Sequence, residues 1–135
     1  LLYDKGDGVP QSDKEAFWWY RSSAGQELAE AQFALGVFYE KGRGVPQDCI
    51  EAANCYFKAS IQGHSEAQSN LGVLYFLGEG VQPNIIEAYK WFSLAGTRGT
   101  GSGKRNLDRL VQEMSPQELK YAESALQRWR KKNRL

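Results

Sequence analysis

The stretch AEAQFALGVFYEKGRGVPQD, residues 29–48, decides the fold, because it returns 36 residues later as SEAQSNLGVLYFLGEGVQPN, residues 65–84. The end of the same stretch stands at the start of the chain as LLYDKGDGV, which places Tyr3, Tyr39 and Tyr75 at one fixed spacing. A period of this length is typical of a solenoid, in which units too small to bury a core alone stack on their neighbours. The repeat predicts an extended binding surface and gives no obvious site for chemistry.

The first part of each copy is expected to form a helix. Ala31, Leu35 and Tyr39 recur four residues apart, which places them on one buried stripe of that helix. Gly36 costs about 1 kcal/mol relative to alanine in a helix interior, so we expect a neighbouring helix to approach closely there. Gly42 can adopt the left-handed conformation that commonly ends a helix.

A second helix is expected in each unit. Ser12, Asp48 and Asn84 are each followed three residues later by a glutamate, which is the pattern of a capping box at a helix start. Each of these helices then carries an alanine and, four residues later, an aromatic ring: Ala16 and Tyr20, Ala52 and Tyr56, Ala88 and Phe92. The alanine allows the neighbouring helix to approach, and the ring fills the space beside it.

The repeat weakens after residue 97. Leu107 keeps the register of Leu35 and Leu71, but Asp108 replaces the glycine that follows them. The segment 96–103 contains four glycines, and we predict that it is the loosest loop of the chain and a flexible joint.

A last helix is expected to begin after Ser115, with proline at its first position and Glu118 completing a capping box. Its apolar residues share one face: Leu119, Ala122, Leu126 and Trp129. Such a helix covers the open end of an array and turns its polar side to water.

The two parts of the chain carry opposite charge. Residues 1–97 hold 7 Lys and Arg against 12 Asp and Glu, whereas residues 98–135 hold 10 against 4. The basic end could serve a polyanion or a membrane surface. We favour a solvated face of the last helix, because the run from Arg128 to Arg134 contains no nucleic-acid motif and no interleaved loop aromatics.

The sequence also bears on membranes and on the chain ends. No apolar stretch approaches the roughly 20 residues that a transmembrane helix requires, which excludes a spanning helix in this segment. Tyr3 is expected near the end of a helix whose earlier residues precede Leu1. We therefore expect the chain to be a piece of a longer protein.

Few residues offer chemistry. Cys55 stands where the other units have Trp19 and Trp91, so it is expected to be a small core residue, and Cys49 cannot reach it within one helix. His64, the single histidine, is expected to be a turn or cap residue, and a catalytic pair with Cys55 is disfavoured. We predict no catalytic residues, no metal site and no cofactor.

These motifs together resemble the Sel-1-like repeat family, a relative of the tetratricopeptide repeat. The matching positions in residues 28–63 are Ala29, Ala31, Leu35, Gly36, Tyr39, Gly42, Gly44, Val45, Asp48, Ala52, Tyr56 and Gly63. The resemblance implies an all-α fold, a right-handed α/α solenoid superhelix of antiparallel helix pairs with a C-terminal capping helix. Residues 1–99 would form the repeats, the first one truncated, and residues 100–135 a degenerate last repeat helix with the capping helix.

The resemblance also implies a function. Members serve as non-enzymatic scaffolds or adaptors for protein interaction, and bacterial relatives include envelope regulators and toxin-neutralising immunity proteins. A partner protein or peptide is expected, nucleic acid is not, and the oligomeric state stays open. The bacterial envelope or periplasm is favoured over the cytoplasm. The alternative function is a small-ligand or glycan-binding protein of the envelope.

In such a solenoid the first helix of each pair lines a concave groove, and we expect the partner to bind there. The residues predicted to face it are Glu30, Phe33, Val37, Glu40, Glu66, Ser69, Val73, Phe76, Arg105 and Arg109. Apolar anchors flanked by charge suit a peptide-binding surface. Alternatively, Phe33 and Phe76 pack between the units.

Overall fold

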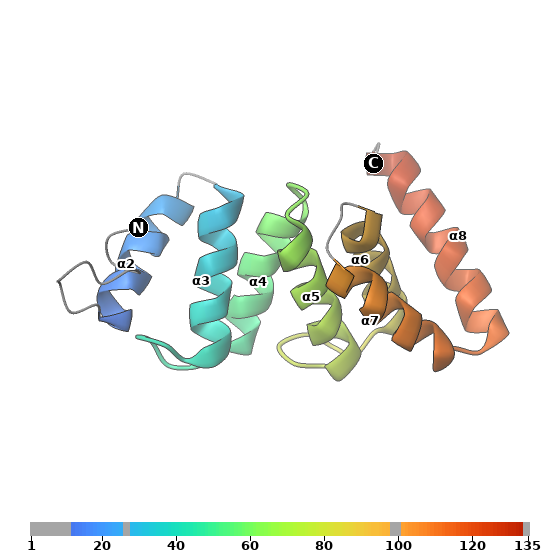
Figure 1. The fold of residues 1–135 in the computed structure, drawn as a ribbon, viewed down its shortest axis with the longest axis horizontal. Helices are drawn as coiled ribbons and strands as arrows, with labels where there is room; N and C mark the ends of the chain where they lie inside the picture. Colours follow the sequence, from blue (N-terminus) through green and yellow to red (C-terminus); the bar gives the residue numbers. More distant parts are fainter. Residues whose placement is uncertain (1–11, 26–27, 98–100, 134–135) are drawn as a thin grey trace.

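The computed structural model describes residues 12–25, 28–97 and 101–133, and the regular structure in these ranges is entirely α-helical. The helices are α2 (Asp13–Ala24), α3 (Ala29–Lys41), α4 (Cys49–Ser60), α5 (Ser65–Leu77), α6 (Ile85–Thr97), α7 (Gly101–Gln112) and α8 (Pro116–Asn133). They follow one another along the long axis of the molecule, from α2 at one end to α8 at the other (Figure 1). The first copy of the repeated stretch, with Tyr3, lies outside the described residues.

The expected helix starts are confirmed. Four polar side chains each accept a hydrogen bond from a backbone N–H in the first turn: Ser12 before α2, Asp48 before α4, Asn84 before α6 and Ser115 before α8. At Ser115 the capping box is complete, because the backbone N–H of Ser115 also donates to Oε1 of Glu118 at 2.9 Å. These caps fix where every second helix begins.

Gly36 and Gly72 mark two close approaches between helices. A Cβ atom on Gly36 of α3 would lie 2.6 Å from the ring of Tyr56 on α4, and one on Gly72 of α5 would lie 2.5 Å from the ring of Phe92 on α6. Both rings are buried. The cost of glycine in a helix is therefore offset by a ring that only glycine admits.

The absence of a glycine at position 108 agrees with this pairing of a helical glycine with a ring on the next helix. Tyr56 and Phe92 each stand eight residues after the cap of their helix, and the residue at that position after Ser115 is Glu123. Since α8 carries no ring there, α7 needs no glycine, and Asp108 is exposed.

The predicted loop over residues 96–103 is wrong at both of its ends, which are helical, and the part of the predicted flexible joint over residues 98–100 lies outside the described residues. Gly96 belongs to α6, and α7 already begins at Gly101, so residues 98–100 alone lie between the two helices and outside the described ranges. Gly103 is buried, and a Cβ on it would lie 2.7 Å from the Cβ of Ala95 and 2.7 Å from the backbone nitrogen of Gly96. These glycines allow α6 and α7 to cross closely, as Gly36 and Gly72 do elsewhere.

The apolar core runs through the stack in two clusters. A smaller cluster joins α2, α3 and α4 through Phe17, Leu35, Phe38 and Cys55, and a larger one extends from α4 to α8. Cys55 is buried, as its alignment with tryptophan predicted. From α2 to α7, each helix packs on its neighbours in the chain, as expected for stacked helical pairs, whereas α8 packs mainly on α6.

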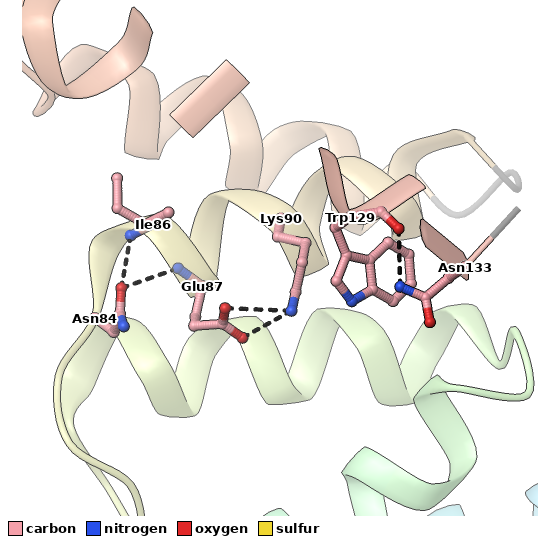
Figure 2. A network of polar contacts seen from close by, with 6 residues as sticks. All are labelled: Asn84, Ile86, Glu87, Lys90, Trp129 and Asn133. Atoms are coloured by element: carbon pink, nitrogen blue, oxygen red, sulfur yellow. Dashed lines mark hydrogen bonds and ion pairs between the residues drawn. The ribbon is translucent and has the colours of Figure 1, made fainter. Parts of the chain in front are cut away.

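The last helix covers the stack as predicted. Ala122 and Leu126 of α8 are buried, and Trp129 packs edge-on against Trp91 of α6 with ring centroids 5.8 Å apart. Lys90 lies between these rings, 4.7 Å and 5.1 Å from their centroids, and pairs with Glu87 at 2.9 Å. Figure 2 shows Trp129 above α6 beside Lys90, with Asn133 bonded to the backbone oxygen of Trp129. Helix α8 thus seals the α6 side of the array.

Candidate protein-interaction groove

The side chains of α3, α5 and α7 that point away from α4 and α6 form one side of the molecule, which we call the inner face. In Figure 1, α5 and α7 lie in front of α4 and α6. The stripe Ala31 and Leu35, and its equivalent Ala67 and Leu71, is buried toward the second layer. Of the predicted groove residues, Ser69 is buried and five are exposed: Glu30, Glu66, Phe76, Arg105 and Arg109.

Phe33 is shared between the core and the surface. Its ring stacks on that of His64 with centroids 4.7 Å apart, and it also packs on Tyr56. The partly buried ring lines two hollows beside α2, of about 450 and 360 Å³. Phe33 thus packs between units and still contributes to the inner face.

His64 caps α5, as its position predicted. Its Nδ1 accepts a hydrogen bond from the backbone N–H of Ala67 at 3.1 Å. Because Nδ1 is the acceptor, Nε2 carries the proton in the neutral ring and donates to Oε1 of Glu30 at 2.9 Å. Glu30 is otherwise exposed to water and is available on the inner face.

Glu40 has a structural contact that the sequence did not reveal. The hydroxyl of the buried Tyr56 donates to Oε1 of Glu40 at 2.6 Å. Burial raises the pKa of Tyr56, and the bond to the Glu40 carboxylate raises that pKa further. The Tyr56 hydroxyl therefore stays protonated, and Glu40 satisfies a buried polar group.

Ser69 is the predicted groove residue that departs most from its expected place. It is only 4 % exposed. Its counterpart one repeat earlier is Phe33, whose long side chain reaches the surface, whereas a serine side chain at the same position is too short to do so. Glu66 on the same helix is exposed.

Three other predicted residues meet in one pocket between α5 and α7. Val73, Phe76 and Arg109 line a hollow of about 320 Å³. The remaining lining residues are Leu77, Phe92, Asn106, Leu110 and Glu113. Sequence reasoning missed Asn106, one turn before Arg109 on α7, and Glu113, which directly follows the end of that helix.

Arg105 and Val37 lie elsewhere on the inner face. The Arg105 guanidinium turns back along α7, so that Nη1 would lie 2.9 Å from a Cβ on Gly101. Arg105 is therefore not part of the pocket between α5 and α7. Val37 is half-buried and lines the smaller hollow beside Phe33.

The charges on the inner face differ between its two ends. Glu30 and Glu66 are exposed on α3 and α5, whereas α7 presents Arg105 and Arg109. Within the described ranges, neither arginine forms an ion pair. The face is therefore acidic toward α3 and basic toward α7.

Both cysteines have a raised pKa. Burial raises the pKa of Cys55 to about 11, which keeps it a thiol and makes it a poor nucleophile at neutral pH. Burial and Glu79 also raise the pKa of Cys49. In the described part of the chain, no three His, Cys, Asp or Glu side chains gather as metal ligands would. No helix there has the length and apolar content needed to cross a bilayer.

The Sel1 repeat matches the sequence three times, over residues 1–27, 29–64 and 65–100. These matches cover most of the chain. The chain belongs to the Sel1 repeat family. Its right-handed solenoid of antiparallel helix pairs is the fold of this family, whose repeats mediate protein interactions and whose members are typically non-enzymatic scaffolds.

Two solved structures are similar to this Sel1 repeat chain. A Sel1 repeat protein from Oxalobacter formigenes is 40% identical, with a TM-score of 0.75 over 78% of this chain. The protein c5321, a protective antigen of uropathogenic Escherichia coli with an SLR fold, is 33% identical, with a TM-score of 0.85 over 92% of this chain. The chain spans only 44% and 27% of the length of these two proteins. A comparison with curated proteins gives no significant match.

Proposed function

We propose that this chain is a non-enzymatic scaffold that binds a partner protein or peptide through the inner face of α3, α5 and α7. The observation that carries this proposal is the row of partly exposed apolar side chains on that face, Phe33, Val37, Val73 and Phe76. Charged side chains flank the row at both ends. Apolar anchors inside a charged rim are the usual composition of a protein-binding surface.

We further propose a role at the bacterial envelope for this chain, which is similar to a protective antigen present in uropathogenic Escherichia coli strains. A regulator of envelope signalling or a toxin-neutralising immunity protein would fit such a surface. The two roles differ in partner number: an immunity protein binds one partner tightly, whereas an adaptor binds several more weakly. We further propose that residues 1–99 form the repeats and that residues 100–135 form the closing part of the array.

The alternative is a small-ligand or glycan-binding protein of the envelope. The pocket between α5 and α7 supports it, since about 320 Å³ is at the lower end of small-ligand sites. Only three of its eight lining residues are polar, however. A glycan needs more hydrogen-bonding partners than three side chains supply, so we favour the scaffold.

Site-specific photocrosslinking tests the proposal. A photoreactive phenylalanine analogue is placed at Val37 on the inner face or, as a matched control, at Asn54 on the exposed outer side of α4. In the native cell, we expect a discrete crosslinked protein from position 37 and none from position 54. Capture from position 54 alone would place the binding surface on the outer side and contradict the proposal.

A further inference from the structure

The pocket between α5 and α7 combines an apolar wall with the guanidinium of Arg109. Its apolar side consists of Val73, Phe76, Leu77, Phe92 and Leu110. Its polar side consists of Asn106 and Arg109 on α7 and of Glu113 directly after the end of that helix. A volume of about 320 Å³ suits one amino-acid residue better than a folded element.

Arg109 is suited to bind a carboxylate. It is exposed, and within the described ranges no ion pair engages its guanidinium, although Glu113 stands four residues later in the turn after α7. An arginine presents parallel N–H donors that match the two oxygens of a carboxylate. Asn106, one turn before Arg109, adds an amide that can donate to the same group.

We propose that this pocket binds the C-terminal residue of the partner, with its apolar side chain against Phe76 and its α-carboxylate on Arg109. This inference rests on the proposed scaffold function. In a C-terminal residue the side chain and the carboxylate leave the same carbon atom, as one small pocket requires. In an extended chain, an internal aspartate or glutamate and the apolar residue next to it point to opposite sides.

The charges of the inner face set the direction of the bound chain. The carboxylate lies at the α7 end, where Arg109 and Arg105 are basic, and the preceding residues run toward α3. There they meet Glu30 and Glu66, so a partner with basic residues before its apolar C-terminus is favoured. Glu113 repels the carboxylate and keeps it at the Arg109 end of the pocket.

Two small probes test this arrangement. N-acetyl-leucine carries the free carboxylate, and N-acetyl-leucinamide has the same side chain without the charge. Titrated into the isotope-labelled chain and followed by NMR, N-acetyl-leucine is expected to shift the amide signals of α5 and α7. N-acetyl-leucinamide is expected to bind about tenfold more weakly, the loss typical of one charge-assisted hydrogen bond. Equal binding of both, or shifts confined to other helices, would overturn the proposal.

A third probe separates the two sources of a carboxylate. N-acetyl-aspartic acid α-amide has an acidic side chain and an uncharged C-terminus. We expect it to bind more weakly than N-acetyl-leucine, because it leaves the apolar wall unfilled. If it binds as tightly as N-acetyl-leucine, the pocket reads acidic side chains and the C-terminal assignment is wrong.

Three variants test whether the carboxylate binds the guanidinium of Arg109. Arg109→Gln is expected to lower the affinity for N-acetyl-leucine about tenfold. Arg105→Gln removes the same charge from the same helix outside the pocket and is expected to change affinity less than about twofold, while Glu113→Gln is expected to tighten binding. An equal loss in both arginine variants would indicate nonspecific charge attraction. If the probes fail while crosslinking at position 37 still captures a protein, the scaffold function stands and the C-terminal inference alone falls.

Discussion

At the residue scale, the contact between a helical glycine and a ring joins α3 to α4 and α5 to α6. Gly36 faces Tyr56 and Gly72 faces Phe92, and in both cases a Cβ would approach the ring to less than 3 Å. The backbone of one helix therefore rests directly on the aromatic side chain of the next. No other residue type fits there without moving the ring.

Gly72→Ala is expected to lower the free energy of unfolding by about 1 to 3 kcal/mol, because overpacking outweighs the gain of about 1 kcal/mol in helix propensity. Urea unfolding followed by circular dichroism measures the change. Gly101→Ala is the matched control, since a Cβ there meets mainly the mobile end of the Arg105 side chain. The control should be neutral or slightly stabilising, and an equally neutral Gly72→Ala would contradict the packing argument.

Cys55 makes stability depend on alkaline pH. Because burial raises its pKa to about 11, the folded chain keeps a proton that the unfolded chain loses at lower pH. Stability is therefore full below the usual thiol pKa of about 8.5 and falls as pH rises toward about 11, by about 2 to 3 kcal/mol. Unfolding curves across this range should decline less in Cys55→Ala. Parallel curves for the two proteins would show that another group titrates.

Residue types predicted burial better than they predicted polar partners. The positions of Leu35, Gly36 and Cys55 followed from repeat spacing, because spacing fixes which side of a helix each residue occupies. The bond between Tyr56 and Glu40 joins two helices, and the sequence holds no signal for it. Ser69 is buried because its side chain is short. Its alignment with Phe33 predicted the helix face but not whether the side chain reaches the surface.

At the scale of elements, Trp91 holds three helices together. It is 1 % exposed on α6, and its ring packs edge-on against Phe57 of α4 and against Trp129 of α8. A side chain of this size at such a junction contributes to the position of the closing helix as well as to the core.

Trp91→Ala is expected to remove about 3 to 5 kcal/mol from the free energy of unfolding, because it deletes a buried aromatic ring and leaves a cavity. Trp18→Ala is the control, since Trp18 is 53 % exposed and should cost less than about 1 kcal/mol. Thermal and urea unfolding compare the two variants. Similar losses in both would show that Trp91 is not a core junction.

The start of α7 shows where reading by composition failed. Four glycines within eight residues usually signal a loop. Here Gly96 and Gly103 instead lie where α6 and α7 cross, so the glycines serve contact between helices. The alignment held the better signal, because Gly103 stands in register with Ala31 and Ala67, the small residues at the equivalent crossings.

At the scale of the whole molecule, charge changes from one end of the inner face to the other. The sequence indicated acidic repeats and a basic closing part, but it could not tell which charges were free. The structure separates them: Glu40 is bonded to Tyr56, whereas Glu66 has no hydrogen bond or ion pair within the described ranges. Glu66 is thus the better place to test the role of charge in binding.

Glu66→Lys is expected to lower the affinity for a partner with a basic segment about three- to tenfold, while the free energy of unfolding changes by less than about 0.5 kcal/mol. Glu40→Lys is expected to lower stability as well, because it leaves the Tyr56 hydroxyl without its acceptor. Affinity for the crosslinked partner and unfolding curves are measured on the same samples. Unchanged affinity in Glu66→Lys would place the binding surface away from α5.

The contact between Trp91 and Trp129 determines how such a chain can change in length. Successive units join through equivalent small-residue contacts, so a duplicated middle unit would find the docking surface it needs on both sides. The third unit carries Trp91, against which α8 packs. A unit added between the third unit and α8 would separate Trp91 from Trp129. A new unit can therefore be inserted inside the array. Each insertion lengthens the distance between the acidic and the basic end of the inner face, so the number of repeats can match partner segments of different length.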